Sequence, residues 1–159
     1  MASDLSDLLH PDLIAVGVSA SNKKMLFQQL GALAAPALAL DPGVVAGALA
    51  EREKLGSTGF GGGVGLPHAR LDGLPRIVIM IARLAQPVEF NAVDDMPVDL
   101  VVAILSPVAA GADHLKALAR VSHRLRDRNF VAKLRGAGSR DAIYALLTAD
   151  DTGNARDAA

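Results

Sequence analysis

Residues 98–105 read VDLVVAIL, and residues 77–82 read IVIMIA. Both runs are almost continuously apolar and rich in Val or Ile, which is typical of strands covered on both faces. Helical periodicity occurs before residue 77 and returns after residue 105. This order of elements indicates an α/β protein. We expect a three-layer α/β/α sandwich in which helices flank a central mixed β-sheet.

The segments before residue 77 predict one strand and two helices. Residues 13–18 (LIAVGV) read as a short strand, and the following segment, KKMLFQQLGALA, repeats its apolar residues at helical spacing. We expect Pro36 to end that helix, because proline lacks a backbone donor. Asp41 and Pro42 suit the N-cap and the first position of a second helix, which places Arg52 near its C-terminal end.

The segments after residue 82 predict a turn region and three helices. Residues 88–96 (VEFNAVDDM) look like a short strand and a turn. Helices are expected from Gly111 to Asp127, over residues 129–135 and from Ser139 onward. The apolar stripe expected on the first of them consists of Leu115, Leu118, Ser122 and Leu125.

The length of 159 residues suits a single domain, which we place at residues 1–148. Residues 149–159 (ADDTGNARDAA) lack apolar periodicity, so we expect a disordered C-terminal tail there.

The composition excludes several classes of function. Sixteen Lys and Arg against seventeen Asp and Glu give a formal net charge of −1, which provides no overall field for nucleic acid or an anionic membrane. The absence of cysteine excludes disulfides, thiolate nucleophiles and zinc sites built on sulfur. The longest apolar stretch, residues 25–40, is too short to span a bilayer, and the N-terminus is acidic where a secretory signal is basic. We expect a cytoplasmic protein with no nucleic-acid partner and no direct membrane insertion.

Residues 54–73, KLGSTGFGGGVGLPHARLDG, hold seven of the fifteen glycines. Glycine lets a backbone approach a ligand closely. A Walker loop, however, needs a Lys and a Ser or Thr directly after its last glycine, and neither residue is there. A dinucleotide-binding loop needs a helix after its glycines, whereas this segment leads into Pro67 and His68. A nucleotide site is therefore disfavoured. Pro67 makes the backbone rigid at this point and holds His68 at a defined place.

Four roles remain open for His68. It could be an ordinary turn residue, a general acid or base, a metal ligand, or a nucleophile that attacks phosphorus. His114 lies in the first turn of a predicted helix, where backbone N–H groups and the helix dipole favour an anion. His123 is nine positions further on and falls on the opposite face of the same predicted helix, so it cannot share a site with His114. No metal-ligand spacing occurs, so a metal site is disfavoured. Asp94 and Asp95 are adjacent and point apart on an extended chain, which disfavours a glycosidase pair.

Residues 51–68, EREKLGSTGFGGGVGLPH, resemble the signature of the fructose/mannitol-type enzyme IIA domain of the bacterial phosphotransferase system. In that family an Arg-Glu pair, a Ser/Thr- and Gly-rich stretch and an apolar pair precede Pro-His, and this histidine carries the phosphoryl group. Residues 90–107, FNAVDDMPVDLVVAILSP, and 114–127, HLKALARVSHRLRD, are similar to two further blocks of the family. The resemblance covers residues 5–148 and is nearest to the nitrogen-regulatory branch.

The resemblance implies a phosphotransferase in which His68 accepts a phosphoryl group from a phosphohistidine on a small HPr-like carrier. Arg52 would hold the phosphoryl oxygens, and His114 would donate a hydrogen bond to the same group. Ser57 and Thr58, with the glycine N–H groups, would complete the anion site. Neither a metal nor another cofactor is expected. Taken without the resemblance, Arg52 reads as a solvated helix-end residue and His114 as a helix-start residue without a ligand.

Three functions follow from this resemblance. In the first, phosphorylation of the protein controls its binding to regulated targets such as a potassium transporter or a sensor kinase. The second is a sugar-transport component that passes the phosphate to a fructose- or mannitol-type IIB, and the third is a binding module without catalysis. In the phosphotransfer readings, the carrier is expected to dock on an exposed apolar patch that includes Phe60 and Leu66.

Overall fold

Two long antiparallel strands, β5 (Val78–Val88) and β6 (Val98–Pro107), form the middle of the sheet in the computed structural model, which describes residues 5–149. β5 contains residues 78–82 of the first apolar run, and β6 contains the whole run at 98–105. Both strands extend beyond these runs.

Four shorter strands complete a six-stranded sheet. β1 (Ile14–Val18) pairs in parallel with β5. On the other side of β6, the glycine-rich segment supplies β2 (Gly59–Gly61), β3 (Val64–Gly65) and β4 (His68–Leu71). β3 and β4 both run parallel to β6 at successive positions, and β2 pairs antiparallel with β3. The expected mixed sheet is confirmed.

Side chains from the central strands alternate between two hydrophobic cores, as the two-residue period of a strand requires. The first core contains Ile79, Ile81, Val102 and Ile104. The second contains Val78, Met80, Val101 and Ala103. Both faces of β6 and of residues 78–82 of β5 are therefore buried, whereas residues 85–87 of β5 are exposed.

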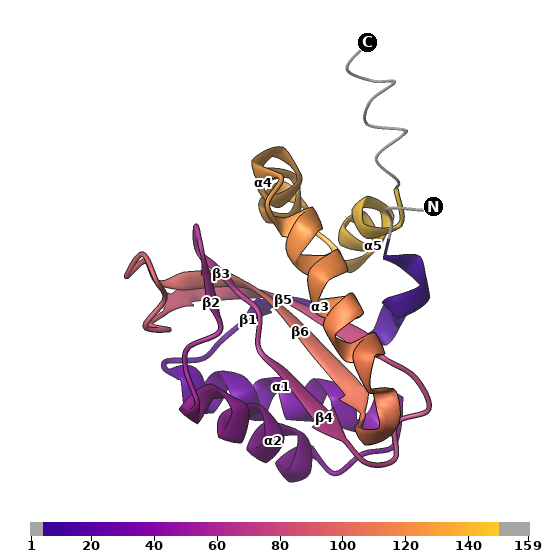
Figure 1. The fold of residues 1–159 in the computed structure, drawn as a ribbon. Coiled ribbons are helices and arrows are strands. Elements are labelled where there is room, and N and C mark those ends of the chain that lie inside the picture. Colours follow the sequence, from indigo (N-terminus) through magenta and orange to yellow (C-terminus); the bar gives the residue numbers. More distant parts are fainter. Residues whose placement is uncertain (1–4, 150–159) are drawn as a thin grey trace.

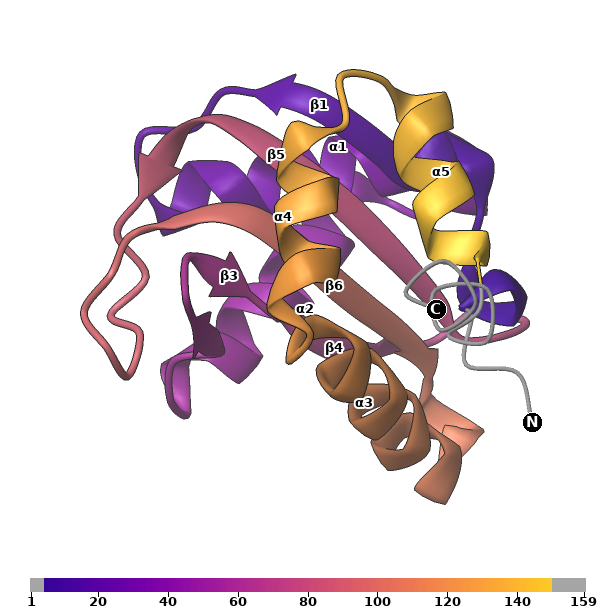
Figure 2. The same ribbon diagram turned by 90° about the horizontal axis from the view of Figure 1, so that it is seen from above.

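Five helices cover the two faces (Figures 1 and 2). α1 (Lys23–Leu38) and α2 (Pro42–Lys54) pack on the face that holds the second core. α3 (Ala112–Leu125), α4 (Arg128–Gly136) and α5 (Arg140–Thr148) pack on the other. Short 3-10 turns occupy residues 6–8, 11–13 and 108–110. The predicted three-layer sandwich is confirmed.

The start of α2 follows its sequence signals, whereas the end of α1 does not. Asp41 caps α2 by accepting hydrogen bonds from the N–H groups of Gly43 and Val44, as predicted. The prediction that Pro36 ends the first helix is wrong, because α1 continues to Leu38. Pro36 is exposed in the last turn, where the helix loses only the hydrogen bond of the missing N–H.

Two further expectations need correction. Residues 89–97 form an irregular connection between β5 and β6 and contain no separate strand. The buried face of α3 is rotated by one residue from the expected stripe: His114, Ala117, Val121 and Leu125 are buried, and Leu115 is 64% exposed. The small Ala117 and the polar His114 hid this face from a reading based on large apolar residues. Of the predicted tail, only Ala149 lies within the described residues.

Candidate active site

The short strand β4 places His68 at the edge of the sheet. The strand pairs with the end of β6, and Arg70 lies opposite Ser106. Ala69 belongs to the core beneath α1 and α2. Because side chains alternate along a strand, His68 and Arg70 point to the opposite face, toward α3.

The first turn of α3 brings His114 to His68. The two imidazole rings have their centroids 5.6 Å apart and are tilted by 52°. His114 is only 5% exposed, and its Nδ1 lies 2.6 Å from Oγ of Ser106, which is fully buried. The sequence does not single out Ser106, although its position in a strand of apolar residues is a usable signal for a polar group with a specific partner.

The hydrogen bonds of His68 define its tautomer. Nδ1 lies 3.0 Å from the carbonyl oxygen of Leu66, which can only accept, so Nδ1 carries the proton. Nε2 is then the acceptor, in agreement with the hydrogen bond that it receives from Nε of Arg52 at 3.1 Å. The imidazole is therefore neutral and directs a lone pair toward Arg52.

Electrostatics also favours the neutral form of both histidines. Burial lowers the pKa of His68 from its ordinary value near 6.5 and is the largest effect. The hydrogen bond to the Leu66 carbonyl opposes it, the positive charge of Arg52 lowers the pKa further, and Glu53 raises it slightly. Burial likewise lowers the pKa of His114, with contributions from Arg70 and His68. At neutral pH, two uncharged imidazoles therefore face each other between arginines.

The C-terminal end of α2 delivers Arg52, as the sequence predicts. Besides its bond to His68, Arg52 donates through Nη1 to the carbonyl oxygen of Gly56 at 3.0 Å. The guanidinium thus connects the helix end, the start of the glycine-rich segment and the histidine. The solvated helix-end reading does not describe this residue, which is partly buried.

Glu53, the residue after Arg52, organises the segment that follows. Its carboxylate is 7% exposed and accepts from Nζ of Lys23 at 2.9 Å. It also accepts the backbone N–H of Thr58 at 2.9 Å and the Thr58 hydroxyl at 2.5 Å. Nζ of Lys23 further lies 4.6 Å from the centre of the Phe90 ring. Glu53 receives no separate role from the sequence alone, although the residue is half of the Arg-Glu pair.

The hydroxyls of Ser57 and Thr58 bond to protein groups in this structure. The Ser57 hydroxyl donates to the carbonyl oxygen of Phe90 at 2.6 Å and accepts the N–H of Gly59 at 3.0 Å. The Thr58 hydroxyl donates to Glu53. These contacts fix the segment against α2 and the connection that follows β5. The expected contact of both hydroxyls with a phosphoryl group stays a prediction. It requires the hydroxyls to give up their hydrogen bonds to Phe90 and Glu53.

Two glycines of the hairpin are required by their surroundings. A Cβ at Gly59 would lie 2.5 Å from Cβ of Ala92. Gly63 has a positive φ of 81°, and a side chain there would meet the guanidinium of Arg135. The glycine run therefore serves close packing and a tight turn.

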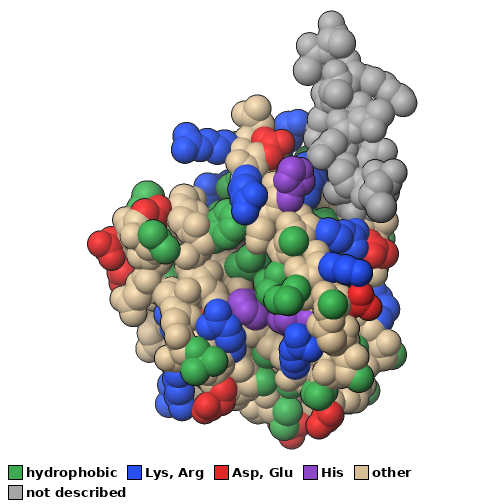
Figure 3. All heavy atoms as spheres, viewed as in Figure 1, with side chains coloured by type: hydrophobic (Ala, Val, Ile, Leu, Met, Phe, Trp, Pro, Cys, Tyr) green, Lys and Arg blue, Asp and Glu red, His purple; other side chains and the backbone are tan. Residues whose placement is uncertain are grey.

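The histidine pair opens onto one face of the protein. Figure 3 shows two neighbouring histidine side chains near the middle of this face, with basic side chains on either side and hydrophobic ones above them. Leu115 on α3 and Leu55 at the end of α2 are 64% and 83% exposed. Phe60 is half-buried, whereas Leu66 is only 7% exposed, so the prediction that Leu66 contributes to an exposed patch is wrong. The Leu66 side chain packs into the core beneath α3.

The other candidates lie apart from this site. His123 is exposed on α3, on the face opposite to His114, as predicted. Asp94 accepts the N–H of Gly62 from the glycine-rich segment and the N–H of Met96 within its own turn, so backbone groups bind its carboxylate. Within residues 5–149, no group of three His, Asp or Glu side chains is placed to hold a metal ion. No helix in this same range has the length and apolar character needed to cross a membrane.

Comparison with known proteins identifies the family. Residues 7–150 match the family model "Phosphoenolpyruvate-dependent sugar phosphotransferase system, EIIA 2". A nitrogen regulatory protein of Bradyrhizobium diazoefficiens is 43% identical over 90% of this chain and 94% of its own length. A fructose-specific EIIA component of Haloferax volcanii is 34% identical over 91% of this chain and 95% of its own.

The fold gives the same result. The crystal structure of nitrogen regulatory protein IIA-Ntr from Neisseria meningitidis superimposes with a TM-score of 0.84 at 32% identity, covering 91% of this chain and 99% of the other. The sequence resemblance to the enzyme IIA family is confirmed. The chain belongs to the EIIA 2 family of the phosphoenolpyruvate-dependent sugar phosphotransferase system.

Proposed function

We propose that His68 accepts a phosphoryl group on Nε2 from the phosphohistidine of an HPr-like carrier, and that the phosphorylation state regulates partner proteins. The observation that carries this proposal is the hydrogen bond between Nδ1 of His68 and the Leu66 carbonyl, which leaves Nε2 as the nucleophilic nitrogen. The relatives that are nitrogen regulatory proteins support the regulatory output over transport.

The transfer step needs no net proton movement at His68. Nε2 forms a bond to phosphorus while the bond between phosphorus and the carrier imidazole breaks. The electron pair of that bond returns to the carrier nitrogen. Nδ1 keeps its proton and its hydrogen bond to Leu66, which stabilises the positive charge of the phosphorylated ring. The lowered pKa of His68 keeps the attacking imidazole neutral at cytoplasmic pH.

Arg52 changes partner in this step. In the free protein its Nε occupies the Nε2 lone pair of His68, so the guanidinium must leave this nitrogen before phosphorus can approach. A small rotation about the anchor to Gly56 places the same N–H groups on the equatorial phosphoryl oxygens. Arg52 thus protects the unphosphorylated histidine and stabilises the phosphorylated one.

His114 supplies an uncharged donor. When the Ser106 hydroxyl donates to Nδ1 of His114, the proton of the neutral ring lies on Nε2, which can donate to a phosphoryl oxygen. Ser106 is then a positioning residue that selects the tautomer. Arg70, on the same face of β4 as His68, adds positive charge beside the group.

The carrier is expected to dock on the histidine face, between Leu55 and Leu115, with Phe60 at the margin. The expected regulated targets are a potassium transporter or a sensor kinase, and we place the protein in the cytoplasm. The alternative is a sugar-specific enzyme IIA that passes phosphate to a fructose- or mannitol-type IIB, which the fructose-specific relative favours.

Intact-protein mass spectrometry tests the proposal. The protein is incubated with phosphoenolpyruvate, enzyme I and the HPr-like carrier. We expect an acid-labile gain of about 80 Da, its loss in His68→Ala, and its retention in His123→Ala, the exposed histidine of α3. No gain with an active carrier would overturn phosphotransfer and leave a binding module. Transfer onward to a purified fructose-type IIB would favour the transport alternative.

A further inference from the structure

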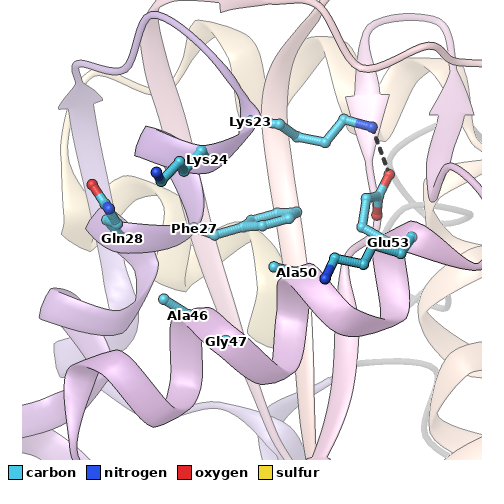
Figure 4. A pocket seen from close by; sticks show the side chains of 9 residues that line it. Lys23, Lys24, Phe27, Gln28, Ala46, Gly47, Ala50 and Glu53 are labelled. Atoms are coloured by element: carbon cyan, nitrogen blue, oxygen red, sulfur yellow. Dashed lines mark hydrogen bonds and ion pairs between the residues drawn. The ribbon is translucent and has the colours of Figure 1, made fainter.

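A groove of about 440 Å³ lies between α1 and α2, on the layer opposite to α3 (Figure 4). Its cause is the way the two helices meet. They pack closely at Gly31, where a side chain would collide with the carbonyl oxygen of Pro42. Toward the start of α1 and the end of α2, the facing positions of α2 are Ala46, Gly47 and Ala50, which are too small to fill the space.

The floor of the groove is apolar and rigid. Phe27 is 3% exposed, and its ring packs edge-on against Phe90 with centroids 6.3 Å apart. Figure 4 shows Ala46 and Ala50 extending from α2 toward the Phe27 side chain. The volume falls within the range of about 300–1,000 Å³ that small-molecule sites occupy. The lining spans residues 23–28 and 46–54, roughly two turns of each helix, which suits a small molecule better than a docked helix.

The rim is cationic. Lys23, Lys24 and Lys54 surround the apolar floor, and Glu53 is the single carboxylate of the lining. Lys23 is paired with Glu53, and Lys54 is paired with Glu51 on the surface. Lys24 has no ion pair with any residue of the 5–149 range. One unpaired ammonium above an apolar cavity complements a single negative charge on an apolar body.

We propose that this groove binds a small amphipathic carboxylate, whose hydrocarbon part lies on Phe27 between the helices and whose carboxylate meets Lys24 and Lys23. At the edge of the same groove, Lys23 is paired with Glu53 and Lys54 with Glu51. A bound carboxylate would therefore compete with these two glutamates for the ammonium groups.

The groove is connected to the histidine site by one residue. Oε2 of Glu53 accepts from both Lys23 and the N–H of Thr58, and Glu53 directly follows Arg52, which contacts His68. A ligand that draws Lys23 away leaves the charge of Glu53 less compensated. Because this charge raises the pKa of His68, the ligand should raise it further. This coupling rests on the proposed role of His68, whereas the binding itself does not.

Titration of the unphosphorylated protein with 4-phenylbutyrate, followed by amide NMR, tests the binding. We expect saturable shifts at Ala46, Gly47 and Ala50, and at least about tenfold weaker binding of the uncharged 4-phenylbutan-1-ol. Gly47→Leu should abolish the shifts by filling the groove, since a Cβ at this position meets no other atom within 4 Å. Lys24→Gln should weaken binding severalfold, and Lys133→Gln, an exposed lysine of α4, should leave it unchanged.

The outcomes separate the two proposals. No saturable shift up to about 10 mM, or equal binding by Gly47→Leu, overturns the groove site and leaves phosphotransfer untouched. The pKa of His68, read from its ring NMR signal with and without 4-phenylbutyrate, tests the coupling. A saturable site with an unchanged His68 pKa would retain the binding and overturn the connection to the histidine. Phosphorylation by the carrier in the absence of probe reports separately on the proposed function.

Discussion

Nε2 of His68 accepts a hydrogen bond from Nε of Arg52 at 3.1 Å, so the nitrogen proposed to receive a phosphoryl group is covered by the residue proposed to stabilise that group. The two residues come from different layers, α2 and the sheet edge. Arg52 is therefore expected to act both before and after transfer, and its geometry is open to direct test.

Arg52→Lys should slow phosphoryl transfer to His68 by about a hundredfold, because an ammonium cannot replace the planar fork that holds two oxygens. Single-turnover transfer from the phosphorylated carrier measures this rate. Arg128→Lys, at an exposed position of α4, is the matched control and should transfer normally. An unchanged rate in Arg52→Lys would remove the guanidinium from the mechanism.

Ser106→Ala should slow transfer by about tenfold, because His114 loses the hydroxyl that selects its tautomer. It should also lower the free energy of unfolding by about 1–3 kcal/mol, the cost of an unpaired buried polar group. The diagnostic measurement is the ring ¹⁵N spectrum of His114, which should show a mixture of tautomers in the variant alone. Ser122→Ala, on the same helix as His114, should leave the transfer rate, the free energy of unfolding and the His114 tautomer unchanged. A tautomer that does not respond to Ser106→Ala contradicts the positioning role.

Glu53→Ala should lower the free energy of unfolding by about 3 kcal/mol, since it leaves Lys23 and the Thr58 N–H without their buried acceptor. Glu51→Ala removes the neighbouring pair with Lys54, whose side chains are 73% and 70% exposed, and should cost less than about 1 kcal/mol. Urea denaturation compares the two. Equal losses would mean that the Glu53 network adds nothing beyond a surface pair.

The stability of the protein should fall as the pH is lowered from about 7.5 to about 5.5. The folded state lowers the pKa of both His68 and His114 below the ordinary value near 6.5, so the native state binds fewer protons than the unfolded chain. Their contribution is fully present above the unfolded pKa and is lost as the pH falls through the folded values. The double variant His68→Gln, His114→Gln should show a flatter dependence in urea denaturation, and His123→Gln the wild-type one. A wild-type slope in the double variant would contradict the lowered values.

Gly59→Ala should destabilise the protein, because the new methyl group would lie 2.5 Å from Cβ of Ala92. A loss of about 1–3 kcal/mol is expected from such overpacking. Gly47→Ala should have the opposite sign and stabilise by about 0.5–1 kcal/mol, since it replaces an exposed helical glycine with space around it. Thermal unfolding measures both. A neutral Gly59→Ala would show that the hairpin can move away from the β5–β6 connection.

The parts of the fold that rest on local chemistry could be predicted from the sequence. The apolar runs at 77–82 and 98–105 predict the central strands, and Asp41 with Pro42 predicts the start of α2. β2, β3 and β4 were missed, since glycine gives no hydrophobic period and these strands are only two to four residues long. Their pairing with β6 comes from tertiary contacts.

In the candidate site, too, some residues could be predicted from the sequence and others could not. His68, His114 and Arg52 belong to recognisable motifs, and the structure brings them together. Thr58 and His114, the partners of Glu53 and Ser106, lie only five and eight residues away, but each contact crosses the end of a helix or strand. Neither pairing therefore follows from a regular helix or strand spacing. The Leu66 prediction failed because a leucine two positions before His68 gives no sign of which face of the chain it occupies.

The pairing of β4 with β6 has a consequence for the newly synthesised chain. Arg52 and His68 emerge from the ribosome first, whereas Ser106 and His114 follow only after β5 and the connection to β6 have been made. Arg52 and His68 therefore exist for a time without His114 and without β6, the strand that pairs with β4. A nascent chain that ends before α3 is expected to be inert toward the proposed carrier, so the proposed phosphorylation would report that the chain has finished folding.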